Sequence, residues 1–141
     1  MPTFCGRISP GERLRTLSPH ECKAWLSSHC EGRLGYQSGR GHRSVVVLYA
    51  VADDQILVRL PDYNEIVRYA PGAEVSLAVD GGTSAAHRET VIVTGTAELA
   101  EGAKRPLIDQ AAFQEGWPSD VETSIICLPL KAVEGFELSD P

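Results

Sequence analysis

The stretch SVVVLYAVADDQILVRLPDYNEIVRY, residues Ser44–Tyr69, predicts a β-hairpin around which the rest of the chain is organised. Its first strand, Val45–Ala52, carries no charge and is rich in β-branched and aromatic residues, and its second is Gln55–Leu60. Asp53-Asp54 interrupts the two strands, and Asp54-Gln55 lacks the glycine of the tightest turns, which leaves the loop length open. Because Val45–Ala52 does not alternate, we expect both its faces to be buried, as in a barrel wall or a subunit interface.

The end of the second strand is a candidate anion site. Arg59 is a cation at the end of an otherwise apolar strand, and the next residues predict a short helix, Tyr63–Tyr69. An arginine fork beside the unpaired N–H groups of a helix start suits an anion. Alternatively, Asp62 and Glu65 have the spacing of a capping box, so the helix start satisfies itself and Arg59 pairs with one of these carboxylates.

The composition restricts the class of protein. A chain of 141 residues with 13 glycines and 9 prolines suits one domain of short strands. The net charge of −6, with no basic run to offset it, argues against nucleic acid and anionic membranes as partners. No apolar stretch approaches the roughly 20 residues of a membrane span, and no secretory signal is recognisable. We therefore expect a cytoplasmic protein without disulfides.

We expect residues 1–16 to form a flexible N-terminal arm and residues 17–141 to form a single domain. The clearest helix is Leu17–Cys30, which Gly32 is expected to end. Its predicted capping residues are Ser18, Pro19 and Glu21, and its apolar stripe consists of Cys22, Trp25, Leu26, His29 and Cys30.

The remaining patterns predict more strands and one more helix. The helix is Gly102–Gly116, and polar connections are expected at Gln37–His42 and Gly81–Arg88. Strands in quick succession predict a mainly β (α+β) fold, an antiparallel six-stranded β-barrel with flanking helices. Besides the hairpin, the predicted strands are Arg33–Tyr36, Ala73–Asp80, Glu89–Leu99, Thr123–Leu130 and a short final one at Val133–Leu138.

Neither a metal site nor a catalytic nucleophile is expected. His42 and His87 are isolated in predicted connections, and the chain has no nucleophile elbow and no phosphate-binding glycine loop. Most of the candidate ligands on the first helix fall on its apolar stripe, where cysteine acts as a small hydrophobe. These candidates are His20, Cys22, His29 and Cys30.

Three segments carry a family resemblance: G-R-L-G at Gly32–Gly35, Y-A-V at Tyr49–Val51 before the acidic turn, and V-T-G-T-A at Val93–Ala97. In this order they resemble the pyridoxamine 5'-phosphate oxidase-like family of flavin-nucleotide-binding split barrels. The resemblance covers Leu17–Leu138. It implies a six-stranded split β-barrel and a homodimer with two flavin sites in the cleft between subunits.

The resemblance also implies which residues hold the flavin. The strand matching Val45–Tyr49 runs beside the isoalloxazine ring in relatives, and the arginine matching Arg59 meets the phosphate. Trp117 lies outside any apolar stripe and either covers the ring or anchors a loop. The implied cofactor-binding residues are Val46, Val47, Leu48, Tyr49, Arg59, Leu60, Asn64 and Trp117.

Three positions depart from the family pattern. Leu60 replaces the usual threonine or serine, Glu65 replaces the phosphate-binding lysine, and Leu48 replaces a common asparagine. A glutamate in place of the lysine puts a repulsion next to a dianionic phosphate.

FMN is the implied cofactor, and a deazaflavin is the alternative. The first functional hypothesis is a flavin-dependent oxidoreductase acting on a small molecule, for which no catalytic residue can be named. The second is a non-catalytic binding module for FMN, a deazaflavin or haem. The third is a dimeric barrel that has lost its cofactor.

Overall fold

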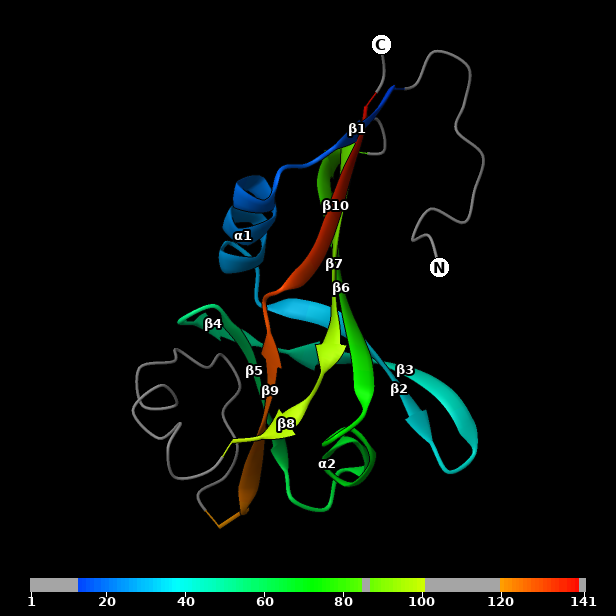
Figure 1. Ribbon diagram of the computed structural model, residues 1–141, viewed down its shortest axis with the longest axis vertical. Helices are drawn as coiled ribbons and strands as arrows, with labels where there is room; N and C mark the ends of the chain where they lie inside the picture. Colours follow the sequence, from blue (N-terminus) through cyan, green and yellow to red (C-terminus); the bar gives the residue numbers. More distant parts are fainter. Residues whose placement is uncertain (1–12, 85–86, 101–119, 140–141) are drawn as a thin grey trace.

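A computed structural model describes residues 13–84, 87–100 and 120–139 (Figure 1). The elements in this part of the chain are β1 (Arg13–Thr16), α1 (Pro19–Ser27), β2 (Glu31–Ser38), β3 (Gly41–Leu48), β4 (Ala50–Ala52), β5 (Gln55–Pro61), α2 (Glu65–Tyr69), β6 (Glu74–Ser84), β7 (His87–Thr96), β8 (Glu98–Leu99), β9 (Thr123–Pro129) and β10 (Ala132–Ser139).

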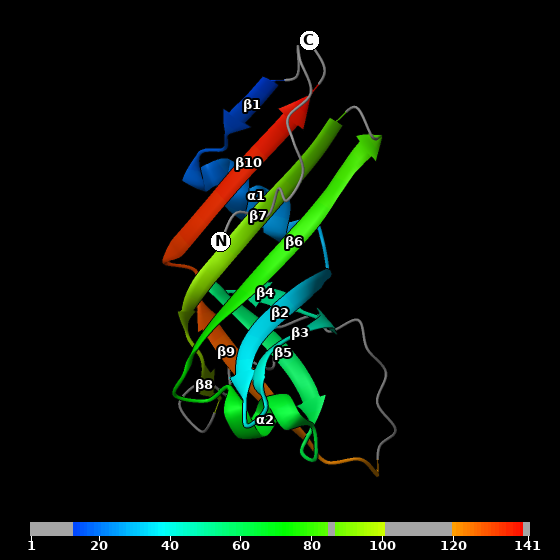
Figure 2. The same ribbon diagram turned by 90° about the vertical axis from the view of Figure 1, so that its right-hand side faces the viewer.

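The strands form two antiparallel sheets. The larger has the order β1-β10-β7-β6-β2-β3 and the smaller has the order β4-β5-β9-β8. Figures 1 and 2 show the long strands β6, β7 and β10 extending away from the smaller sheet, with α2 at the opposite end of the molecule. Helix α1 packs against β10 and β7. This arrangement confirms the predicted mainly β, antiparallel split-barrel fold with flanking helices.

Two of the predicted strands each divide between the two sheets. The predicted strand Val45–Ala52 becomes β3, which pairs with β2, and β4, which pairs with β5. Likewise, Glu89–Leu99 becomes β7 in the larger sheet and β8 in the smaller one. Tyr49 and Ala97, at the two divisions, are almost completely buried. The prediction of one continuous strand at each place was wrong, because apolar content does not reveal a change of partner.

Strand β3 has one buried face within the chain. Val47 is 5% exposed, whereas Val46 is 59% exposed. The predicted burial of both faces is therefore wrong for the single chain, and burial of Val46 in a subunit interface stays a prediction. In β6, by contrast, the predicted alternation is confirmed: Val75, Leu77 and Val79 are buried.

Helix α1 begins as predicted and ends early. The Ser18 hydroxyl accepts from the Glu21 N–H at 3.1 Å, and the Glu21 carboxylate accepts from the Ser18 N–H at 3.0 Å, which forms the predicted capping box. The helix ends at Ser27, so Cys30 is exposed and the stripe stops short of it. Gly32 lies in β2 instead, where a Cβ atom would be 2.9 Å from the Leu77 side chain.

Two predicted connections are mostly strand. Strand β2 runs to Ser38 and β3 starts at Gly41, which shortens the predicted loop to a turn at which Gly41 has φ +109°. Strand β6 continues to Ser84 and β7 starts at His87, so the prediction that His87 lies in a connection was wrong. The polar residues and glycines in these extensions are typical of loops, so the sequence alone did not predict them as strands.

The remaining predictions concern the N-terminal arm, the second long helix, Trp117 and membrane spans. The last four residues of the predicted arm form β1, which pairs with β10. The predicted helix Gly102–Gly116 and Trp117 lie outside the described residues. Neither α1 nor α2 has the length and apolar character that crossing a membrane requires.

The turn between β4 and β5 is tight despite its lack of glycine. Ala52 pairs with Gln55, so the loop consists of Asp53 and Asp54, with φ values of 49° and 58°. Two consecutive residues with positive φ form the type I′ turn, which suits the twist of a hairpin. Aspartate tolerates this left-handed conformation better than most residues, but less well than glycine.

We expect Asp54→Gly to be more stable than Asp54→Ala by about 1 kcal/mol, because only glycine adopts positive φ without a Cβ clash. Both substitutions remove the exposed ion pair between Asp54 and Lys23, so this comparison isolates the backbone effect. Urea unfolding monitored by circular dichroism measures the difference. Equal stability of the two variants would contradict the left-handed turn.

Candidate functional site

A small cavity lies where β3, β5 and the start of α2 meet. Its volume is about 230 Å³. Five of the nine residues that line it are aliphatic, and its polar groups come from Tyr36, Arg43, Asn64 and Glu65. We call it the apolar cavity; the residues that line it are Tyr36, Arg43, Val45, Val46, Val47, Leu60, Asn64, Glu65 and Ile66.

A larger polar hollow adjoins the apolar cavity. Its volume is about 570 Å³, and it shares Asn64 and Glu65 with the cavity. We call it the arginine groove, because Arg40 and Arg68 lie on it; the Arg68 guanidinium also lies 5.4 Å from the centre of the Tyr69 ring. The groove is lined by Ser38, Gly39, Arg40, Asp62, Tyr63, Asn64, Glu65, Arg68 and Tyr69.

The carboxylate of Glu65 links the two hollows. The Tyr36 hydroxyl donates to Glu65 Oε1 at 2.7 Å, and Arg43 Nη1 lies 3.5 Å from the same oxygen. Burial of the ring, followed by this hydrogen bond, raises the pKa of Tyr36, so its phenol stays a donor at neutral pH. The Arg43–Glu65 pair is about half exposed and contributes little to stability by itself. The carboxylate that lines the cavity, Glu65, is therefore already paired with a cation of the same lining, Arg43.

The start of α2 is capped by Asn64. Its side-chain oxygen accepts from the Ile66 N–H at 2.9 Å. The alternative in which Asp62 caps this helix was wrong: Asp62 accepts instead from the hydroxyl of Ser124 on β9. Because the loop between Pro61 and Asn64 makes its own turn, the helix begins two residues later than the predicted Tyr63.

Arg59 does not line the apolar cavity. It neighbours Leu60 on β5, and successive side chains of a strand point to opposite faces, so Leu60 enters the cavity while Arg59 lies on the other side. There Arg59 Nε donates to the Thr123 hydroxyl at 3.1 Å. Among the described residues, Arg43 and not Arg59 lines the cavity.

The implied cofactor-binding residues divide into three groups. Val46, Val47, Leu60 and Asn64 are brought together at the apolar cavity. Leu48, Tyr49 and Arg59 do not line it, and Tyr49 is a core residue whose hydroxyl donates to the Leu26 carbonyl at 2.7 Å. Trp117 lies outside the described residues.

Arg43, Tyr36 and Glu65 contribute to the cavity but were not among the implied binding residues. Sequence signals for two of them existed. Tyr36 is the last residue of the G-R-L-G-Y segment that carries the family resemblance. Glu65 stands at a position where the family has a lysine. Arg43 gave no signal, because it lay in a stretch expected to be near a polar loop.

The sheets and cavity define a split-barrel protein whose hollow lies at the junction of the two sheets. The family model described as "Pyridoxamine 5'-phosphate oxidase" matches residues 18–137. The chain therefore belongs to the pyridoxamine 5'-phosphate oxidase family. A search among curated proteins found no match.

Solved structures share the fold at low sequence identity. An FAD-binding protein from Mycobacterium smegmatis is 20% identical with a TM-score of 0.76, and the match covers 87% of this chain and 98% of that one. An FAD-binding protein from Mesorhizobium loti is 22% identical with a TM-score of 0.72, covering 92% and 100%. An FAD- and haem-binding protein from Mycobacterium smegmatis is 12% identical with a TM-score of 0.70, covering 93% and 74%.

Proposed function

We propose that this chain binds a flavin nucleotide, with FMN as the cofactor, and acts as an oxidoreductase on a small molecule. The observation that carries the proposal is the adjoining pair of hollows, one apolar and one lined by arginines, which meet at Asn64 and Glu65. A flavin nucleotide has the same division between a flat ring and an anionic tail. The family, and relatives described as FAD-binding, support the same class of ligand.

The ring would lie against the aliphatic wall of the apolar cavity. Val46 and Val47 of β3 and Leu60 of β5 offer that wall, and Asn64 marks the exit toward the groove. The phosphate would then lie near Arg43, Arg40 or Arg68, because Arg43 lines the cavity and the other two line the adjoining groove. When bound, a flavin supplies hydride or electron transfer, while the protein supplies position and electrostatics.

Flavin is a better candidate than haem for these hollows. Haem iron is held by histidine, cysteine, methionine or tyrosine side chains. The residues lining the two hollows in the described part of the chain include no histidine, cysteine or methionine; tyrosine is the only type of haem ligand among them, at Tyr36, Tyr63 and Tyr69, and Tyr36 is engaged with Glu65. A deazaflavin offers the same ring shape as a flavin and remains the alternative cofactor.

The cavity of one chain is too small for the whole cofactor. At about 230 Å³ it falls below the range of about 300–1,000 Å³ that is typical of ligand pockets. Val46, which lines it, is 59% exposed, so one wall of the cavity lies at the surface of the chain. We infer that a second copy covers this wall, which gives a homodimer with the cofactor between subunits.

The purified full-length protein, stripped of bound cofactor and titrated with FMN, tests the proposal. We expect a shift of the flavin absorbance bands and quenching of flavin fluorescence at one FMN per chain, followed by turnover with reduced nicotinamide and an acceptor. Binding without turnover would leave the binding-module alternative, and a deazaflavin titration run in parallel identifies that cofactor. No saturable binding of either would support a barrel that has lost its cofactor.

Variants at the exit of the apolar cavity test where the phosphate lies. Arg43→Ala should weaken FMN binding by about 1.5–3 kcal/mol, because a charge-assisted hydrogen bond is lost. Glu65→Gln should tighten binding about tenfold, because it removes a negative charge beside the phosphate while keeping a hydrogen-bond acceptor for Tyr36. Arg59→Ala is the comparison, measured by the same titration: a loss equal to that of Arg43→Ala would move the phosphate to the opposite face of β5.

Val46→Asp tests the subunit interface. Burying an unpaired carboxylate in an apolar interface is costly, so we expect this variant to elute as a monomer and to lose flavin binding. Leu14→Asp on β1, also an exposed apolar residue at 47%, is the matched control and should leave the dimer intact. Light scattering after gel filtration measures the mass; a monomeric wild type would contradict the interface.

A further inference from the structure

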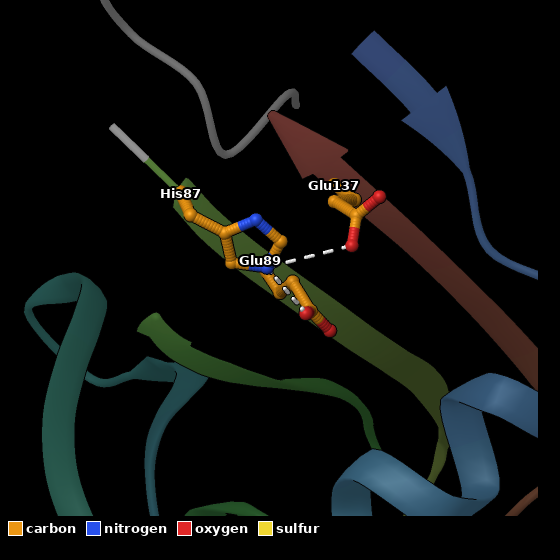
Figure 3. A group of neighbouring side chains, drawn as sticks. All are labelled: His87, Glu89 and Glu137. Carbon is orange, nitrogen blue, oxygen red and sulfur yellow. Dashed lines mark hydrogen bonds and ion pairs between the residues drawn. The ribbon is translucent and has the colours of Figure 1, made fainter. Parts of the chain in front are cut away.

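A cluster of three ionisable side chains lies far from the hollows described above. Figure 3 shows His87 and Glu89 on β7 and Glu137 on β10, with the imidazole directed at both carboxylates. These residues come from the start of β7 and the end of β10, the end of the larger sheet that points away from α2 (Figure 2). The cluster is therefore separate from the proposed flavin site.

Strand register places the two carboxylates directly against each other. Glu137 is the cross-strand partner of Glu89, and His87 lies two residues along β7 on the same face. Side chains of directly opposed residues have Cβ atoms about 4.5–5.5 Å apart, so two carboxylates in this arrangement repel each other unless a cation lies between them. A cation placed between the two carboxylates would relieve this repulsion.

The nearby charges leave the cluster negative. Arg15 on β1 donates to Glu137 Oε1 at 2.9 Å and also forms a bidentate contact with Glu21. The guanidinium of Arg15 is therefore shared by the carboxylates of Glu137 and Glu21, and none of these contacts involves Glu89. Among these contacts, the three carboxylates of Glu21, Glu89 and Glu137 therefore outnumber the one guanidinium of Arg15.

The geometry suits a small divalent ion. His87 Nε2 lies 3.0 Å from Glu89 Oε1 and 3.5 Å from Glu137 Oε2, and all three ligand atoms lie within 4.8 Å of one another. Ligands about 2.0–2.1 Å from a tetrahedral metal are separated by roughly 3.3 Å, so an ion would open the 3.0 Å contact between His87 and Glu89, replace their hydrogen bond, and draw Glu137 slightly closer. Arg15 holds Glu137 by its other oxygen, which leaves Oε2 aimed at the site.

We propose that His87, Glu89 and Glu137 form a binding site for a first-row divalent transition metal, with Zn²⁺ as the probe. One imidazole nitrogen and two carboxylate oxygens are ligands that Zn²⁺ accepts, whereas Mg²⁺ prefers oxygen alone. The side chains are 34%, 20% and 19% exposed, which leaves one side of the ion open to water. The ion would join β7 to β10 and so stabilise the end of the larger sheet.

Calorimetric titration of the metal-free, full-length protein with Zn²⁺ tests the site. The titration uses the Cys30→Ser background and a phosphine reductant, because Cys30 is an exposed thiol and thiolates are common ligands of zinc. We expect one Zn²⁺ per chain, and a rise in melting temperature with Zn²⁺ because the ion binds only the folded chain. Mg²⁺ at the same concentration should produce neither effect.

Two substitutions in the cluster and two outside it decide the assignment. His87→Ala and Glu89→Gln should each weaken Zn²⁺ binding at least about tenfold and remove the rise in melting temperature. Glu134→Gln, on an exposed position of β10, and His20→Ala, on an exposed position of α1, should bind as the background does. Circular dichroism checks the fold of each; if His87→Ala does not fold, Glu89→Gln decides, because it preserves the shape and a hydrogen-bond acceptor.

Two results would overturn the proposal. The first is an absence of saturable Zn²⁺ binding by the background protein, which would make the cluster an ion-pair network only. The second is unchanged binding by Glu89→Gln and His87→Ala, which would place the ion on other groups. Neither result bears on the flavin titration, because the two sites share no residue.

Discussion

The transfer of the chain between two sheets is the constraint on which the other features depend. At Tyr49 and again at Ala97 the backbone leaves the larger sheet and enters the smaller one, and both residues are buried where the sheets meet. Tyr49 secures its corner in two ways: its N–H donates to the Cys30 carbonyl and its hydroxyl donates to the Leu26 carbonyl. A buried tyrosine with both groups bonded ties the corner to the end of α1.

The same corner creates the apolar cavity. Because β3 stops at Leu48 and β5 returns in the other sheet, the two strands diverge, and α2 covers the space between them. If the chain continued in the larger sheet after Leu48, adjacent strands of that sheet would occupy this space. The cavity is therefore a consequence of the split in the barrel, and most of its aliphatic residues come from β3 and β5, strands that belong to different sheets.

Charge at the mouth of the cavity determines how well an anion is held there. In this chain Glu65 accepts from Tyr36 and pairs with Arg43, so an entering phosphate competes with a carboxylate for the same guanidinium. That competition is an affinity penalty rather than a steric block, because Arg43 and Glu65 are about half exposed and can separate into water. Two more arginines, Arg40 and Arg68, line the adjoining groove, which shares Asn64 with the cavity.

Local patterns determined a large part of the architecture. The capping box at Ser18 and Glu21, the alternation in β6, and the apolar runs of β5 and β9 were readable because each depends on near neighbours in the chain. The family also followed from the sequence, through the order of its segments rather than through any single residue.

Only the tertiary structure decided the features that depend on strand register and on a change of sheet. The divisions at Tyr49 and Ala97 leave no mark in hydrophobicity, because a buried corner is as apolar as a buried strand. His87 looked isolated in the sequence, yet antiparallel pairing brings it beside Glu137, fifty residues away. Likewise, Arg43 lines the cavity and Arg59 does not, because the face on which a side chain lies is set by pairing and not by its position along the chain.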